Sequence, residues 1–123
     1  MHNYKNLHIW QEGINLARKI YEVTGNFPAN EKYGIVSQMT RAAVSIPSNI
    51  AEGLGRVSTK EQIHFLEIAY GSLREVDCQL DIAKDLAYIS DDELSDVEKQ
   101  IEKVAALIAG VRKQRSASLN AKR

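Results

Sequence analysis

Apolar residues recur at helical spacing along most of this chain, in four segments separated by turn-forming residues. The longest segment covers residues 58–89, and its apolar positions advance by three or four residues at a time: Leu66, Ala69, Leu73, Val76, Leu80, Ala83 and Ala87. Such steps place side chains on one face of an α-helix. A second apolar set widens that face to an arc of about 200°, counted at ~100° per residue: Phe65, Ile68, Ile82, Leu86 and Ile89. This arc is wider than one bundle core requires, which predicts that part of it meets another subunit.

Three further segments repeat the pattern. Residues 7–24 carry the stripe Trp10, Ile14, Ala17 and Tyr21, flanked by Ile9, Leu16 and Ile20. Residues 31–54 carry Ile35, Met39, Ala42, Ala43, Ile46, Ile50 and Leu54. The segment that begins at Ser90 carries Leu94, Val97, Ile101, Val104, Ile108 and Val111. Four amphipathic helices with short connections predict an all-α fold, an antiparallel up-down four-helix bundle.

Local signals mark where three of these helices begin. Ser58 and Glu61 have the spacing of a capping box, in which the serine caps the helix and the glutamate bonds back to it. Ser90 and Glu93 have the same spacing. Asn30 is the expected N-cap of the second helix.

The length and composition fit one soluble domain. Of the 123 residues, 44% are hydrophobic and 26% charged, an ordinary globular composition. Residues 1–115 are expected to form the bundle, and residues 116–123 a flexible basic tail. No apolar run reaches the ~20 residues of a membrane span, and no signal-peptide pattern is present. The single cysteine, Cys78, fits a reducing compartment. The cytoplasm is therefore the expected location, with no membrane partner.

The formal net charge is zero, but the charges lie in blocks. The balance is +3 over residues 1–60, −8 over residues 61–110 and +5 over residues 111–123. The usual meaning of such blocks is a solvated acidic face and a solvated tail. The alternative is a basic tail that contacts nucleic-acid phosphate, through Arg112, Lys113, Arg115, Lys122 and Arg123.

A proline interrupts the pattern of the second helix, inside residues 41–56. Pro47 removes a backbone donor and clashes with the carbonyl of Ala43, which costs ~3 kcal/mol in an ordinary helix interior. The helix is therefore expected to be kinked at Pro47. Ser45 and Ser48 are placed to bond the carbonyls that the proline frees.

A polar stripe follows the other side of this helix at steps of three or four residues: Arg41, Ser45, Ser48, Asn49, Glu52 and Arg56. One interpretation is a structural network that fixes the helix against its neighbours or across a subunit boundary. The other is a recognition surface for RNA phosphate or a protein partner. In that case Arg41 and Arg56 are the anchors, and Ser48 and Asn49 the donors.

The run Ser-Ile-Pro-Ser-Asn-Ile-Ala-Glu-Gly at residues 45–53, within a residue order that matches from Trp10 to Ala83, resembles the bacterial four-helix-bundle proteins encoded within intervening sequences of 23S rRNA genes. The resemblance implies a bundle that assembles into a ring-like homopentamer, and it brings no settled biochemical activity. The fold is also similar to that of the accessory protein of diversity-generating retroelements. That protein binds a reverse transcriptase and nucleic acid through a basic exterior, whereas this chain is neutral with an acidic middle.

Few residues suggest a metal site or catalysis. Glu61 and His64 have the Glu-x-x-His spacing of di-iron bundles, but such a site needs a second motif and two more glutamates. His2 and His8 have no glutamate three residues earlier. Cys78 has no basic cluster beside it in sequence, which favours a structural cysteine over a nucleophile. The sequence therefore predicts no metal, no cofactor and no enzymatic activity.

Two functional hypotheses follow. The first is a non-enzymatic oligomeric scaffold or adaptor for a protein partner. The second is an RNA- or nucleic-acid-binding accessory protein associated with rRNA intervening sequences or a retroelement. It would use Arg41, Arg56 and the basic tail, and a ring would gather several tails and add avidity.

Overall fold

The computed structural model describes residues 3–121, and these form four α-helices. They are α1 (His8–Thr24), α2 (Ile35–Leu54), α3 (Thr59–Asp85) and α4 (Asp91–Ala121). Two short 3-10 helices, η1 (Tyr4–Asn6) and η2 (Ala29–Glu31), precede α1 and α2. No strand occurs within residues 3–121. The expected all-α class with four helices is confirmed.

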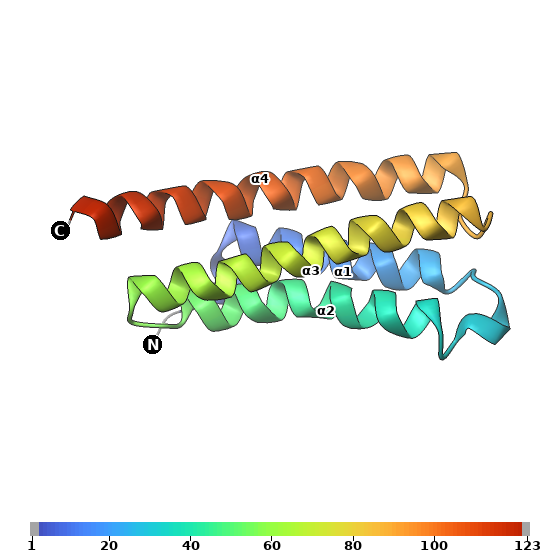
Figure 1. Ribbon diagram of the computed structural model, residues 1–123, viewed down its shortest axis with the longest axis horizontal. Helices are drawn as coiled ribbons and strands as arrows, with labels where there is room; N and C mark the ends of the chain where they lie inside the picture. Colours follow the sequence, from blue (N-terminus) through green and yellow to red (C-terminus); the bar gives the residue numbers. More distant parts are fainter. Residues whose placement is uncertain (1–2, 122–123) are drawn as a thin grey trace.

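The helices enclose one core. The main contacts join α1 to α2, α2 to α3, α3 to α4, and α1 to α4. Each helix therefore lies beside its neighbours in sequence, and the first lies beside the last. Figure 1 shows the helices side by side along one long axis, with the chain turning back between successive helices.

The buried side of α1 differs from the stripe expected for it. Ile9, Leu16 and Ile20 belong to the core, while Trp10 and Ile14 are only half-buried. The reason is that the apolar arc of α1 serves two purposes. Its flanking residues and Ala17 reach the common core, while Trp10 and Ile14 line the groove at the seam with α2. Tyr21, the last member of the stripe, is exposed.

The second helix passes through Pro47 without interruption. Pro47 is buried against α1 at Gly13, where an added Cβ would lie 3.4 Å from the Cβ of Pro47. The expected kink remains a prediction. Asn49 Nδ2 donates to the carbonyl of Ser45 at 2.8 Å, which is not the Ala43 carbonyl that Pro47 leaves without its helical donor. Ser48 makes no side-chain hydrogen bond within residues 3–121.

The start of α2 lies later than the sequence pattern suggests, so the expected N-cap at Asn30 is wrong. Residues 29–31 form η2 instead, and α2 begins at Ile35 after Gly34. The carboxylate of Glu31 is engaged elsewhere, because it accepts a hydrogen bond from the Tyr88 hydroxyl at 2.9 Å. This bond fastens the α1–α2 connection to the connection between α3 and α4.

The two expected capping boxes form to different extents. At Ser90 the box is complete: its Oγ accepts from the Glu93 backbone at 3.2 Å, and its own backbone N–H donates to the Glu93 carboxylate at 3.1 Å. At Ser58 only the forward half is present, with the Oγ accepting from the Glu61 backbone at 3.3 Å.

The third helix ends at Asp85, before the expected limit at residue 89. Its end has the hydrogen bonds of a Schellman motif. The Tyr88 N–H donates to the Ala83 carbonyl at 2.8 Å, and the Ala87 N–H donates to the Lys84 carbonyl at 2.9 Å. Ala87 has a φ of 59°, the left-handed conformation usually taken by glycine. Because the sequence has no glycine here to mark the end of the helix, the apolar pattern predicted an end four residues too late.

The fourth helix continues to Ala121, where the sequence pattern predicts a flexible tail from residue 116. Residues 111–121 contain neither glycine nor proline, so nothing in them stops helix propagation. Lys122 and Arg123 lie outside the described residues. Ile108 is the last buried residue of α4, and Figure 1 shows the final turns projecting past the other helices.

Candidate recognition surface

The polar stripe of α2 divides into separate groups in the structure. Ser45 and Asn49 face α3, whereas Ser48 lies at the seam with α1. Glu52 and Arg56 form an ion pair at the end of the helix. The stripe is therefore not one continuous surface, and its members range from half-buried to exposed.

The first group joins α2 to α3 by side-chain hydrogen bonds. The hydroxyls of Ser45 and Ser72 lie 2.8 Å apart, and Asn49 Nδ2 donates to Ser45 Oγ at 2.9 Å. All three residues are half-buried. Their hydrogen bonds are satisfied within the chain, which is what a structural role requires.

A polar groove opens beside this group, between α2 and α3. Its volume is about 310 Å³, and it is lined by Gln38, Arg41, Ala42, Ser45, Ser72 and Glu75. Arg41 and Glu75 are exposed and form no ion pair within residues 3–121. Of the two expected anchors, Arg41 is thus the one without an ion pair within residues 3–121.

Arg56, the other expected anchor, is engaged by its own chain. Its guanidinium pairs with Glu52 and lies over the Phe65 ring at 4.9 Å from the ring centre. Its carbonyl accepts from Gln62 Nε2 at 2.7 Å. These contacts link Arg56 to the α2–α3 connection, and its ion pair with Glu52 is half exposed.

A second groove lies between α1 and α2 and is mostly apolar. Its volume is about 270 Å³, and it is lined by Tyr4, Trp10, Ile14, Ala17, Val44, Pro47, Ser48 and Ala51. The rings of Tyr4 and Trp10 meet edge to face with centres 5.3 Å apart, which places η1 at the groove. Pro47 therefore shapes an apolar surface, and it is not simply a break in a helix.

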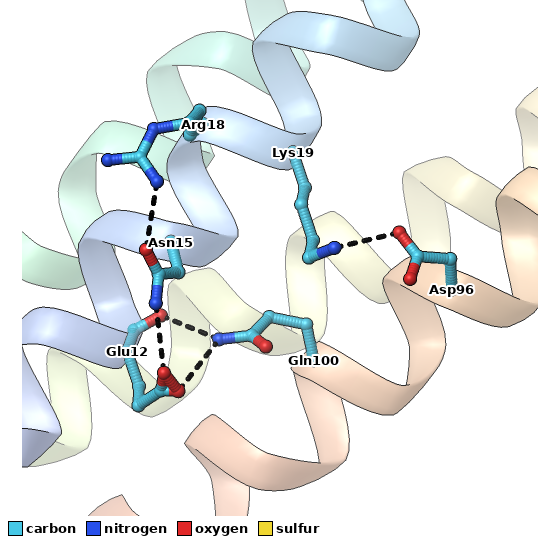
Figure 2. A network of polar contacts seen from close by, with 6 residues as sticks. All are labelled: Glu12, Asn15, Arg18, Lys19, Asp96 and Gln100. Carbon is cyan, nitrogen blue, oxygen red and sulfur yellow. Dashed lines mark hydrogen bonds and ion pairs between the residues drawn. The ribbon is translucent and has the colours of Figure 1, made fainter.

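A third group, centred on Glu12, connects α1 to α4 (Figure 2). Glu12 is 7% exposed. Its carboxylate accepts from Asn15 Nδ2 at 2.9 Å, and Gln100 Nε2 donates to its backbone carbonyl at 3.0 Å. Lys103 lies 3.5 Å from the same carboxylate. Arg18 donates to Asn15 Oδ1 at 3.0 Å and so holds the amide in place.

The electrostatics of this group favour the charged form of Glu12. The hydrogen bond from Asn15 is the main cause that lowers the pKa of Glu12 below its ordinary value, with Gln100 and Lys103 adding to it against the effect of burial. Nearby, Lys19 pairs with Asp96 at 2.8 Å. The group fixes the register of α1 against α4.

Sequence reasoning missed the Glu12 group. Glu12 and Gln100 are both buried polar residues, yet they lie 88 positions apart. The available signal was their position, since Gln100 precedes Ile101 on the inward side of α4 and Glu12 precedes Gly13 on that of α1. Nothing in the sequence says that these two sides face each other.

The expected nucleic-acid contacts lie on the projecting end of α4. Arg112 is half-exposed and pairs with Glu67 at 3.4 Å. Lys113 is exposed, and Arg115 is half-buried. Lys122 and Arg123 fall outside the described range.

Residues considered for chemistry lie apart from one another. No group of three or more His, Cys, Asp or Glu side chains that could hold a metal ion occurs in residues 3–121. His64 packs edge-on against Phe65, and Cys78 is exposed rather than buried as a structural cysteine. Between residues 3 and 121, no helix combines the length and apolar character needed to cross a membrane.

Four long helices around one core, with side-chain networks between them and open grooves outside, define an all-α four-helix-bundle protein. The model of the 23S rRNA-intervening sequence protein family matches residues 5–110, and the chain belongs to that family. No curated protein matches the sequence.

A solved structure supports the same fold. It is the crystal structure of a protein with unknown function from the S23 ribosomal protein family, from Bacteroides thetaiotaomicron VPI-5482. The two chains superpose with a TM-score of 0.79 at 20% identity, over 85% of this chain and 95% of the other. At that identity the likeness establishes the fold.

Proposed function

We propose that this protein is a non-enzymatic oligomeric scaffold or adaptor, which holds copies of itself and a protein partner together. The supporting observation is the set of large apolar side chains that one chain leaves exposed outside the α2–α3 connection: Tyr21, Tyr33, Val44, Ile68, Tyr70, Ile82 and Leu86. Covering such surface gains about 25 cal/mol per Å², and Val44 extends it into the mostly apolar groove between α1 and α2.

The fate of the polar residues supports the same proposal. The polar groups of Asn49, Arg56 and Glu12 have hydrogen-bond or ion-pair partners within the chain. These contacts join helices and connections of one chain, which is what a structural role requires. The ring-like homopentamer implied by the family resemblance is the assembly that we propose.

The proposal is tested on protein purified from its own cells at low salt. Light scattering gives the mass of the particle, and mass spectrometry identifies what accompanies it. An assembly of several copies with a defined protein and no nucleic acid supports the proposal. A monomer that carries no partner contradicts it.

A matched pair of variants tests the apolar groove between α1 and α2. Val44 lines this groove and is 43% exposed, whereas Val57 is fully exposed in the α2–α3 connection. Both tolerate lysine without burying a charge. Val44→Lys is expected to reduce the particle mass or release the partner, and Val57→Lys to leave both unchanged. Equal behaviour of the two variants would remove the groove from the proposal.

A second candidate function is nucleic-acid binding, which the projecting basic end of α4 favours. Its test combines removal of residues 116–123 with Arg112→Ala, Lys113→Ala and Arg115→Ala. If these residues bind RNA phosphates, the dependence of affinity on salt concentration becomes much shallower. A retained slope places the RNA contacts elsewhere, with Arg41 as the next residue to test.

A further inference from the structure

The two ends of the molecule carry surfaces of opposite charge. One is the basic tip, which we define as Val111, Arg112, Lys113, Arg115 and Leu119 of α4. These residues follow Ile108, the last buried position of the helix. Figure 1 shows that this end of α4 extends beyond the start of α1 and past the other helices.

The basic tip also keeps an apolar component. The buried positions Val104 and Ile108 continue at helical spacing to Val111, Arg115 and Leu119. The side of α4 that faces the core in its first half therefore continues past the core. Its last members are half-buried instead of buried.

The second surface, the acidic patch, lies on the C-terminal half of α3. We define it as Glu75, Asp81, Ile82, Asp85 and Leu86. Ile82 and Leu86 are each 47% exposed, and they follow one another by one helical turn. Asp81 and Asp85 repeat the same step beside them. In Figure 1 this part of α3 lies at the opposite end of the long axis from the end of α4.

Neither surface is neutralised within its own chain. Among the ion pairs of residues 3–121, none includes Glu75, Asp81 or Asp85. On the basic tip, only Arg112 is paired, with Glu67, and both side chains are about half exposed. An exposed pair of this kind contributes roughly 0–1 kcal/mol, so it does not prevent Arg112 from meeting another partner.

We propose that the basic tip of one copy of this chain docks on the acidic patch of a second copy. The complementary charges would steer and orient the contact, and the apolar residues of both surfaces would be covered together. A second copy is the occupant favoured over RNA because each chain carries both surfaces in equal measure, with a net charge of zero.

The contact is heterologous, since it joins two different surfaces. Such contacts repeat from copy to copy, and they close into a ring when the rotation between copies allows it. The inference therefore rests on the oligomeric scaffold proposed above and names the surfaces that build it.

Three charge-neutralising variants test the contact, and all replace exposed or half-exposed side chains. The tip variant is Arg112→Gln, Lys113→Gln and Arg115→Gln. The patch variant is Glu75→Gln, Asp81→Asn and Asp85→Asn. The control removes three carboxylates from other surfaces, Glu22→Gln, Glu98→Gln and Glu102→Gln. Circular dichroism checks that all three keep the helical content of the wild type.

Sedimentation and light scattering at about 0.05 M and about 0.5 M salt are the measurements. We expect the wild type and the control to assemble at low salt and to weaken at high salt. The tip and patch variants are each expected to lose at least about tenfold in association constant. Mixing the two variants should restore one contact only, between the intact tip of one and the intact patch of the other, and give a 1:1 pair.

Three outcomes would overturn the inference. If either variant assembles like the wild type, the contact lies elsewhere, while the scaffold proposal stands. If the mixture gives no pair, the tip and the patch do not meet. If nuclease treatment dissolves the wild-type assembly, RNA is the occupant of the tip. A wild type that is monomeric at low salt would instead overturn the oligomeric scaffold itself.

Discussion

Glu12 shows how a charged side chain is kept inside this bundle. Burying a carboxylate is costly unless hydrogen bonds and a counter-charge replace the water it loses. Asn15 and Gln100 supply the hydrogen bonds, and Lys103 supplies the charge. The arrangement predicts how the stability of the protein depends on pH.

Replacing this carboxylate should alter stability in acid. Because the pKa of Glu12 is lowered in the folded state, its stabilising contribution is present above its ordinary value of 4.5 and is lost as the pH falls through the folded value. Glu12→Gln is expected to lower the free energy of unfolding at neutral pH by about 1–3 kcal/mol and to flatten its decline below pH 4.5.

Urea unfolding at a series of pH values measures this effect. Glu22→Gln, an exposed glutamate on the same helix, is the control and should leave the profile of the wild type unchanged. An unchanged acid decline in Glu12→Gln would show that other carboxylates cause it.

Among residues 3–121, Ala87 is the residue other than glycine that has a positive φ. Its φ of 59° is easier for glycine than for alanine. Ala87→Gly is therefore expected to raise the free energy of unfolding by about 0.5–1 kcal/mol. The same change at Ala106, exposed in the middle of α4, should lower it by about 1 kcal/mol. Thermal unfolding of the two variants, with opposite shifts expected, decides the point.

At Gly53, α2 packs closely against α3. An added Cβ would meet the Cβ of Phe65 at 2.8 Å and the carbonyl of Gln62 at 3.2 Å. Gly53→Ala is therefore expected to force the helices apart and to cost about 1–3 kcal/mol. Gly71 is the control, because no atom lies within 4 Å of an added Cβ there. Gly71→Ala should stabilise α3 by about 1 kcal/mol, and equal destabilisation of both variants would contradict this account.

Pro47 can be tested for its effect on the shape of α2. Pro47→Ala restores a backbone donor that an ordinary helix would use, so circular dichroism should show equal or greater helicity. The ring of Pro47 also forms part of the groove wall beside Val44. The particle mass measured by light scattering is therefore expected to change. An unchanged mass would mean that the proline has no part in assembly.

The positions of the helices could largely be predicted from the sequence, because a run of apolar residues at steps of three and four leaves few alternatives. The errors lie at the ends. Asn30 resembles an N-cap, but the hydrogen bond between Glu31 and Tyr88 depends on a contact between distant connections. The end of α3 depends on a left-handed alanine that no local pattern marks.

The candidate surface was less predictable than the fold. The sequence identified the polar residues of α2, but their division among two seams and an ion pair follows from where α1 and α3 lie. Cys78 illustrates the same limit: it was expected to be structural and is exposed. The apolar pattern of a single helix shows on which side of that helix a residue lies. It does not show which neighbouring helix covers the residue.

The whole molecule is tighter at its centre than at the end of α4. Residues after Ile108 add no buried side chain, so they have little packing to protect them from local unfolding. Trypsin is expected to cut first after Arg112, Lys113 or Arg115 and to leave the rest of the bundle resistant. Mass spectrometry of a short digest checks this. Early cuts at Lys19 or Arg74 would contradict it.

The hydrogen bond between Gln100 and Glu12 has a consequence for how this protein folds during its synthesis. A growing polypeptide leaves the ribosome from its amino end, and its first helices can fold before the last is made. Here α4 packs against both α1 and α3. The apolar sides of these helices that α4 covers therefore stay exposed until residues 91–108 leave the ribosome. A chain released too early has no means of covering those sides by itself. Such a shortened chain would expose to solvent the apolar residues that α4 covers, and exposed apolar surface of this kind favours aggregation.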